Sequence, residues 1–263
     1  MSAARKFARK LVFVLPALLA IGWLPAQAAE VPVIAAAANL SFALPEIATA
    51  FERASGRRVK LSFGSSGNLA RQIVQGGPYE VFLSADESWV RFVRESGRAE
   101  DSGRVYAIGR LAFFAPNGSP VKVDAELAGL AAALRAGDLR RIAIANPDLA
   151  PYGAASREVL IRKGLWDALR DKIAMGENVG QTAQFALTGA VQAAFVPYSI
   201  ARAPTFQGKG RATLVPSTLH TPIVQSMTLI EGAGATARAF LEFMGTPESR
   251  AILESFGFSV PPQ

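Results

Sequence analysis

The chain has 263 residues, of which half are apolar and 19% are charged, so it can bury one large or two modest cores and is too apolar for a disordered protein. It has a net charge of +7, no cysteine and one histidine. This composition excludes disulfides, thiol chemistry, a cysteine-anchored lipoprotein and a metal cluster built from histidines.

The first 28 residues have the three parts of a secretory signal peptide: a basic segment (residues 5–10), an apolar run (11–24) and small residues at the cleavage positions (26–28). The apolar run is short for a membrane span, so we expect cleavage and a periplasmic location rather than an uncleaved anchor. The segment carries four of the 28 basic residues and no acidic one, which leaves 24 basic and 21 acidic residues, a net charge near +3. Without a basic stripe, we expect no nucleic-acid partner.

Apolar strand patterns and helical patterns then alternate along the chain. Each early strand pattern is followed by helix-start residues, and the final helix is expected to begin at Thr246 with Pro247 in its first turn and to end near Gly257. Further helices are expected from about Asn39 to Gly56, after Ser66, after Asp86, and over 153–170 and 181–188. The predicted strands are residues 31–37, 59–63, 81–83, 111–115, 142–145, 193–196, 212–215 and 223–230.

This alternation predicts an α/β protein with mainly parallel sheets that are flanked by helices. About seven such units fit two lobes with a cleft between them. No Gly/Ser-rich or Pro-rich linker is present, so we expect the chain to cross between lobes through short segments. We assign residues 29–109 and 224–263 to lobe 1 and residues 110–223 to lobe 2.

Small uncharged residues recur where a strand ends and a helix begins. Ligands of open α/β sheets bind beyond the carboxyl ends of the strands, where helix N-termini offer free N–H groups. Each segment is also an ordinary helix cap or tight turn, and the residues alone leave both interpretations open. The segments are residues 38–41, 65–67, 150–153 and 178–181.

The absence of charge in these segments favours one kind of ligand. A site built only from N–H and O–H donors suits a fully ionised tetrahedral dianion, because every ligand oxygen accepts hydrogen bonds. Monohydrogen phosphate would need an acceptor for its proton. An unpaired proton costs roughly 1–3 kcal/mol, so such a site selects by charge state and size.

The ordered set of these motifs resembles the periplasmic molybdate-binding proteins of ABC importers. The resemblance extends from about residue 30 to residue 261. The motifs that carry it are Ala35-Ala36-Ala37-Ala38-Asn39, Phe63-Gly64-Ser65-Ser66-Gly67, Ser84-Ala85-Asp86, Ala145-Asn146-Pro147 with Ala150-Pro151-Tyr152-Gly153, and Asn178-Val179-Gly180-Gln181.

The resemblance implies a two-lobed type II periplasmic-binding-protein fold with the anion in the cleft. It also implies that Asn39 donates through its side chain, Ala38 and Asn39 add a backbone N–H, and Ser66 donates through its hydroxyl and N–H. Tyr152 and Val179 would donate through backbone N–H groups, so their side chains should matter less. These residues would hold the metal only through the oxygens of molybdate or tungstate, without direct coordination.

Relatives with serine in place of Asn39 also use a tyrosine hydroxyl from the region that matches residues 195–199. The best-aligned position here is Pro197, with Tyr198 one step further on. The chain is therefore closer to the subgroup that has asparagine at position 39.

The same residues are compatible with two other functions. One is capture of another oxyanion, such as sulfate or a phosphonate; the other is a secreted serine hydrolase that uses Ser66 as nucleophile and His220 as base. His220 lies in a Pro- and Thr-rich stretch (216–222) that is typical of a surface connection, and Asp86 with Glu87 is typical of a helix start rather than a metal site. We therefore expect a monomeric binding protein, not an enzyme, with no cofactor, that delivers its ligand to a transmembrane permease.

Overall fold

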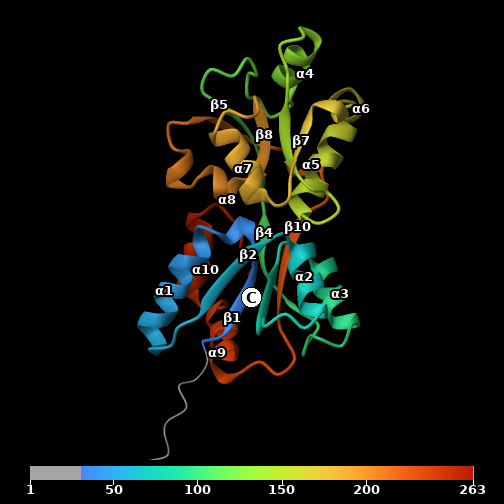
Figure 1. Cartoon of the computed structure of the whole chain (residues 1–263). Helices are drawn as coiled ribbons and strands as arrows, with labels where there is room; N and C mark the ends of the chain where they lie inside the picture. Colours follow the sequence, from blue (N-terminus) through green and yellow to red (C-terminus); the bar gives the residue numbers. More distant parts are fainter. Residues whose placement is uncertain (1–30, 263) are drawn as a thin grey trace, which may run out of the picture. The chain divides into compact units, whose positions relative to one another are not determined.

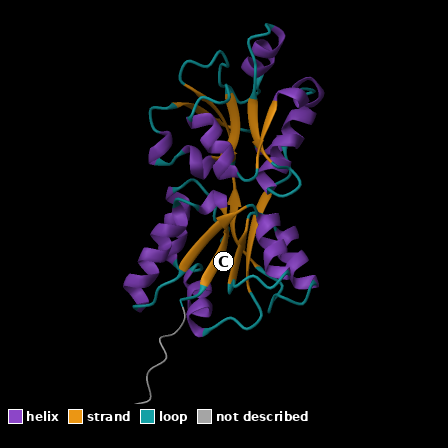
Figure 2. Cartoon of the chain, viewed as in Figure 1, coloured by secondary structure: helices purple, strands orange, loops and turns teal. Residues whose placement is uncertain are grey.

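The computed structural model describes residues 31–262, which form two five-stranded sheets flanked by helices (Figures 1 and 2). The signal-peptide prediction lies outside the described residues. The first sheet has the strand order β2-β1-β3-β10-β4 and the second the order β7-β6-β8-β5-β9.

The first sheet is built from both ends of the described chain, and the second from its middle (Figure 1). The strands of the first sheet are β1 (Val33–Ala37), β2 (Lys60–Gly64), β3 (Val81–Ser84), β4 (Arg104–Gly109) and β10 (Ile223–Leu229). Those of the second sheet are β5 (Leu111–Pro116), β6 (Ile142–Ala145), β7 (Ile173–Gly176), β8 (Ala193–Pro197) and β9 (Gly210–Leu214).

Both sheets are more mixed than the mainly parallel arrangement that the alternation predicted. In the first sheet, β1 pairs in parallel with β2 and β3, while β10 pairs antiparallel with β3 and β4. In the second, β6 pairs in parallel with β7 and β8, while β5 pairs antiparallel with β8 and β9. The antiparallel strands lie next to the crossings: β4 ends at Gly109 and β5 begins at Leu111, so the chain changes sheet through one residue.

Helices cover both faces of the first sheet (Figure 2). On one face Phe51 packs edge-on against Phe240, with ring centroids 5.3 Å apart. On the other face Ile73 and Val93 are fully buried. The helices of the first face are α1 (Ala43–Ser55), α9 (Ala235–Phe243) and α10 (Pro247–Ser255), and those of the second are α2 (Ser66–Val74) and α3 (Glu87–Glu95).

One apolar core surrounds the second sheet, in which Phe113 and Phe195 pack with ring centroids 5.0 Å apart. Its helices are α4 (Ala128–Arg135), α5 (Pro151–Arg162), α6 (Trp166–Leu169), α7 (Val179–Leu187) and α8 (Tyr198–Ala201). Short 3-10 helices are η1 (Ala38–Leu40), η2 (Arg170–Lys172), η3 (Pro204–Phe206) and η4 (Ser217–Leu219).

Most predicted elements are confirmed, including the Thr246 N-cap of α10 and the left-handed Gly56 that ends α1. The strands β4 and β7 and the helices α4 and α8 were not predicted, and the first long helix begins at Ala43 rather than near Asn39, which lies in the separate 3-10 helix η1. The single helix expected over 153–170 is wrong, because Gly164 at φ +65° separates α5 from α6. A positive φ ends an α-helix, since only glycine adopts it without strain.

The residues from Val31 onward form one compact unit, so the lobe boundaries after residues 109 and 223 stay a prediction. Both fall beside a crossing, at the end of β4 and within the first residues of β10. Among the described residues, we find no helix with the length and apolarity needed to cross a membrane.

Candidate anion-binding site

All five predicted site residues line one small cavity, to which both sheets contribute. The cavity has room for about one water molecule: the centre of a water-sized sphere can move within about 10 Å³. Larger hollows exist, such as one of about 390 Å³ beside Arg110, but no predicted site residue lines that one. The small cavity is lined by uncharged residues throughout: Ala37, Ala38, Asn39, Gly64, Ser65, Ser66, Ala85, Ala150, Pro151, Tyr152 and Val179.

The side chain of Ser66 is oriented to donate. Ser66 is the first residue of α2 and is 1% exposed. Its Oγ accepts a hydrogen bond from the backbone N–H of Ala85 at 3.0 Å. Since that bond occupies a lone pair and not the hydroxyl proton, the proton remains available for a ligand oxygen.

The caps of α2 and α7 leave particular N–H groups free. In α2 the Ser65 side chain accepts from the N–H of Asn68. The N–H of Gly67 donates to the Leu149 carbonyl at 2.9 Å, so in the first turn the N–H of Ser66 remains without a hydrogen-bond partner. In α7 the Asn178 side chain accepts from the second and third N–H groups, which leaves the N–H of Val179. Neither free N–H has a partner among the described residues.

The starts of α5 and η1 have no side-chain cap at all. Proline at the first position of α5 has no N–H, and the next two N–H groups after Tyr152 fold back to the carbonyl of Ala150. The N–H of Tyr152, 2% exposed, is therefore left for a ligand, as is that of Asn39 in η1, whereas the register of β1 with β2 directs the N–H of Ala38 at the Gly64 carbonyl. Buried N–H groups without partners cost roughly 1–3 kcal/mol each, so a ligand that accepts from all of them is strongly stabilised.

Behind the cavity lies a buried polar network that the sequence did not indicate. Asn39 Nδ2 donates to Gln225 Oε1 at 2.9 Å, and the Tyr106 hydroxyl donates to the same oxygen at 2.7 Å. Gln225 Nε2 donates to the Tyr152 hydroxyl at 3.1 Å, and Gln225 is fully buried. The side chain of Tyr152 therefore has more structural importance than a backbone-only role implies. A polar residue in the apolar strand Ile223–Leu229 is the one signal that could have pointed to Gln225.

Burial controls the protonation of the Tyr106 and Tyr152 hydroxyls. Desolvation raises the pKa of Tyr152, against the lowering effect of hydrogen bonds with Gln225 and Asn39. Desolvation, with a smaller contribution from Tyr152, also raises the pKa of Tyr106 well above its usual value. Both hydroxyls therefore keep their protons at and well above neutral pH.

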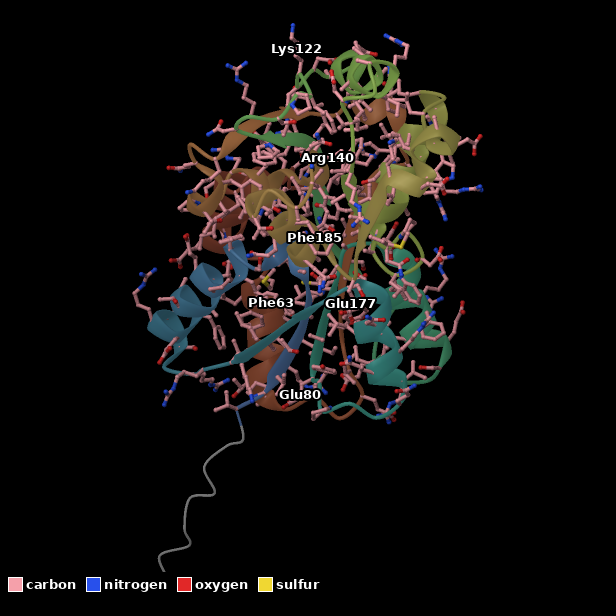
Figure 3. The ribbon with its side chains drawn as sticks, turned by 45° about the horizontal axis from the view of Figure 1, so that its top comes forward. Phe63, Glu80, Lys122, Arg140, Glu177 and Phe185 are labelled. Carbon is pink, nitrogen blue, oxygen red and sulfur yellow. The ribbon has the colours of Figure 1, made fainter. Side chains whose placement is uncertain are left out.

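Hydrogen bonds also join the segments from the two sheets around the cavity. The Ser199 hydroxyl donates to the Asn39 carbonyl at 2.8 Å. At the rim, Asn68 Nδ2 donates to the carboxylate of Glu177, which Figure 3 labels, at 3.0 Å. The helix starts of the two sheets are therefore held together without an ion pair between cavity-lining residues.

Tyr198, whose approach to the ligand the sequence left open, is not among the residues that line the cavity. Its ring lies under the guanidinium groups of Arg110 and Arg202, at 5.0 and 5.6 Å from the ring centroid. The 195–199 region instead contributes Ser199 to the site, through its bond to the Asn39 backbone.

The residues of the hydrolase hypothesis are not brought together. Ser66 lines the small cavity, whereas His220 lines the hollow beside Arg110, where its Nδ1 contacts the Thr221 carbonyl. The expectation that residues 216–222 form a surface connection is wrong for His220, which is 6% exposed because the stretch packs its ring inward.

Metal-ligand chemistry is also absent from the described residues, which contain no group of three acidic or histidine side chains suited to a metal ion. Asp86 caps α3 by accepting from the Trp89 N–H at 3.1 Å, as its position at a helix start predicted. The cavity lining thus contains hydrogen-bond donors and no acidic or histidine side chain.

Two five-stranded sheets, flanked by helices and sharing one cavity at their helix starts, define the periplasmic-binding-protein fold. The chain belongs to the family of bacterial extracellular solute-binding proteins, whose model matches residues 32–259.

Within that family the chain is similar to proteins named for molybdate. It is 38% identical to the molybdate-binding protein ModA of Rhodobacter capsulatus over 89% of this chain and 90% of that protein. It is 30% identical to ModA of Escherichia coli over 86% of this chain and 87% of that protein. The solved periplasmic molybdate-binding protein of Azotobacter vinelandii superposes with a TM-score of 0.79 at 32% identity, over 89% of this chain and all of that one.

Proposed function

We propose that this protein captures molybdate outside the cytoplasm, and tungstate equally well, through the uncharged cavity at the four helix starts. One observation carries the proposal: the buried N–H groups of Ser66, Tyr152, Val179 and Asn39 are free of other partners, and these residues line the same small cavity. A tetrahedral dianion accepts from all of them at once. The names of the most similar relatives support the same ligand.

Selection in this site rests on protonation and size. The lining residues supply N–H and O–H donors and no carboxylate, so an anion that carries a proton loses a hydrogen bond that a full dianion makes. The cavity, with room for about one water-sized sphere, must widen to admit a four-oxygen anion, and it would have to widen much further for an organic ligand. Tungstate has nearly the same size and charge as molybdate, so we expect little discrimination between the two.

The anion bridges the two lobes in this proposal. Asn39 and Ser66 come from segments of the first sheet, and Tyr152 and Val179 from segments of the second. A ligand that binds both sets favours the closed arrangement over an open one. We propose that the mature protein, exported and cleaved after residue 28, acts as a monomer without a cofactor and delivers the closed complex to the permease of an ABC importer.

Calorimetric titration of the mature protein with molybdate, tungstate, sulfate and phosphate tests the proposal. We expect tight binding of molybdate and tungstate, and weak or no binding of the other two. Heat with sulfate or phosphate alone would contradict the molybdate assignment. Val179→Ala provides an internal control, since only its N–H is proposed to act, and its affinity should stay close to that of the parent.

A further inference from the structure

The Asn39 carboxamide presents an unbalanced set of hydrogen bonds. Its Nδ2 donates to Gln225, while its Oδ1 is buried without a partner among the described residues. The atom that does not face Gln225 is the one left for the cavity that Asn39 lines. An oxygen in that position would repel a dianion, because both atoms are acceptors.

The nitrogen and oxygen of a carboxamide occupy nearly the same space, so the hydrogen-bond partners decide which orientation is adopted. If the amides of Asn39 and Gln225 both turn by half a rotation, Gln225 Nε2 donates to Asn39 Oδ1 and to the Tyr106 oxygen. The Tyr106 proton then goes to the Ser84 carbonyl, which lies at 3.1 Å. The Tyr152 hydroxyl donates to Gln225 Oε1 across the 3.1 Å contact.

This second arrangement satisfies every polar atom of the network and frees Asn39 Nδ2 for the ligand. It requires both phenols to keep their protons, which their burial ensures. It also requires Gln225, which contacts Asn39 Nδ2 at 2.9 Å, while the Tyr152 hydroxyl is the second side-chain partner of the Asn39 carboxamide. The Tyr152 hydroxyl joins this network from α5, whose own start supplies a free N–H to the cavity.

We infer that Gln225 is a positioning residue, which turns the Asn39 carboxamide so that its N–H group faces the anion and thereby makes the site selective for fully deprotonated oxyanions. This inference rests on the proposed function of the cavity. Gln225 makes no contact with the ligand; it acts through Asn39, and the Tyr106 and Tyr152 hydroxyls fix its own orientation.

A double-mutant cycle measures the coupling. Gln225→Met keeps the length of the side chain and removes its hydrogen bonds, and should weaken molybdate binding by about tenfold or more. Asn39→Ser replaces the carboxamide with a hydroxyl that rotates freely, so Gln225→Met in that background should weaken binding by less than about threefold. Equal losses in both backgrounds would show a merely structural role and overturn the inference.

Gln192→Met is the matched control. Gln192 is also hydrogen-bonded, to the N–H of Arg140 and the carbonyl of Asp138, but it lies away from the small cavity. Its substitution should lower thermal stability without changing molybdate affinity. Gln225→Met should also lower the ratio of molybdate affinity to hydrogen-phosphate affinity. Gln192→Met should leave this ratio unchanged.

A neutron structure of the parent protein with molybdate tests the inference without any substitution. We expect deuterons on Asn39 Nδ2 directed at a ligand oxygen, and a deuteron of Gln225 Nε2 directed at Asn39 Oδ1. Deuterons of Asn39 Nδ2 directed at Gln225 would refute it. If the parent binds sulfate and not molybdate, the proposed function alone fails, and the same cycle and structure with sulfate still decide the role of Gln225.

Discussion

Substitution of Ser66 by alanine separates ligand binding from folding at the centre of the site. The change removes a hydroxyl that is 1% exposed and that accepts from the Ala85 N–H at 3.0 Å. The hydrogen bond to a charged ligand oxygen is lost, which contributes about 1.5–3 kcal/mol and corresponds to roughly 10- to 150-fold in the dissociation constant. The buried Ala85 N–H is left without its acceptor, so unfolding becomes easier by about 1–3 kcal/mol.

Calorimetry with molybdate and thermal unfolding of the ligand-free protein measure these two effects. Ser65→Ala is the matched control, because its hydroxyl caps α2 by accepting from the Asn68 N–H. Loss of an N-cap costs about 0.5–2 kcal/mol of stability, so Ser65→Ala should lower the melting temperature with little change in affinity. If Ser66→Ala binds molybdate as tightly as the parent, the site is assigned wrongly.

Three further predictions follow from the same structure. In Gly67→Ala the new Cβ would lie 2.7 Å from Trp89 and 3.0 Å from the Leu149 backbone, so it should push the segments of residues 67 and 149 apart. Molybdate binding, measured by calorimetry, should become about tenfold weaker. An unchanged affinity would contradict this. Burial raises the pKa of the Asp86 carboxyl, so protonation of this group favours the folded state at low pH, and this stabilisation is lost as the pH rises through the folded-state pKa. Asp86→Asn keeps a capping side chain without the charge and should therefore melt no lower than the parent at pH 7. Asp86→Ala has no cap and should melt about 2–4 °C lower. Because the raised pKa values of Tyr106 and Tyr152 keep both phenols neutral, molybdate affinity should be constant from about pH 7 to pH 9.5, and a fall in that range would refute the proton order of the network.

Local signals predicted the helix starts well because they depend on neighbours in sequence. Asp86, Asn178 and Thr246 each cap the helix that follows them, and proline occupies the first turn of α5 and α10. The four anion-binding segments were also predicted from neighbouring residues at helix starts, and residues of all four line one cavity. Their role as ligands stays a prediction until binding is measured.

The polar network was not predictable, because its partners are distant in sequence. Gln225 is 186 positions from Asn39, 119 from Tyr106 and 73 from Tyr152. The strand β7 was not predicted because it lies at the edge of its sheet and only Gly176 of its four residues is buried, so its sequence shows no buried apolar run. The helix α4 was missed although Leu130, Ala133 and Leu134 have helical spacing.

The uncharged lining of the cavity has a consequence for the medium in which the protein works. Screening by dissolved salt weakens attraction between formal charges over about 8–10 Å, but it has much less effect on short hydrogen bonds between buried groups. In the proposed site the attraction comes from N–H groups at the starts of η1, α2, α5 and α7. The affinity should therefore vary little between dilute and saline surroundings. Separation of the two lobes would also remove most of the hydrogen bonds to the anion at once, because the lining has no fixed positive charge that would continue to hold it.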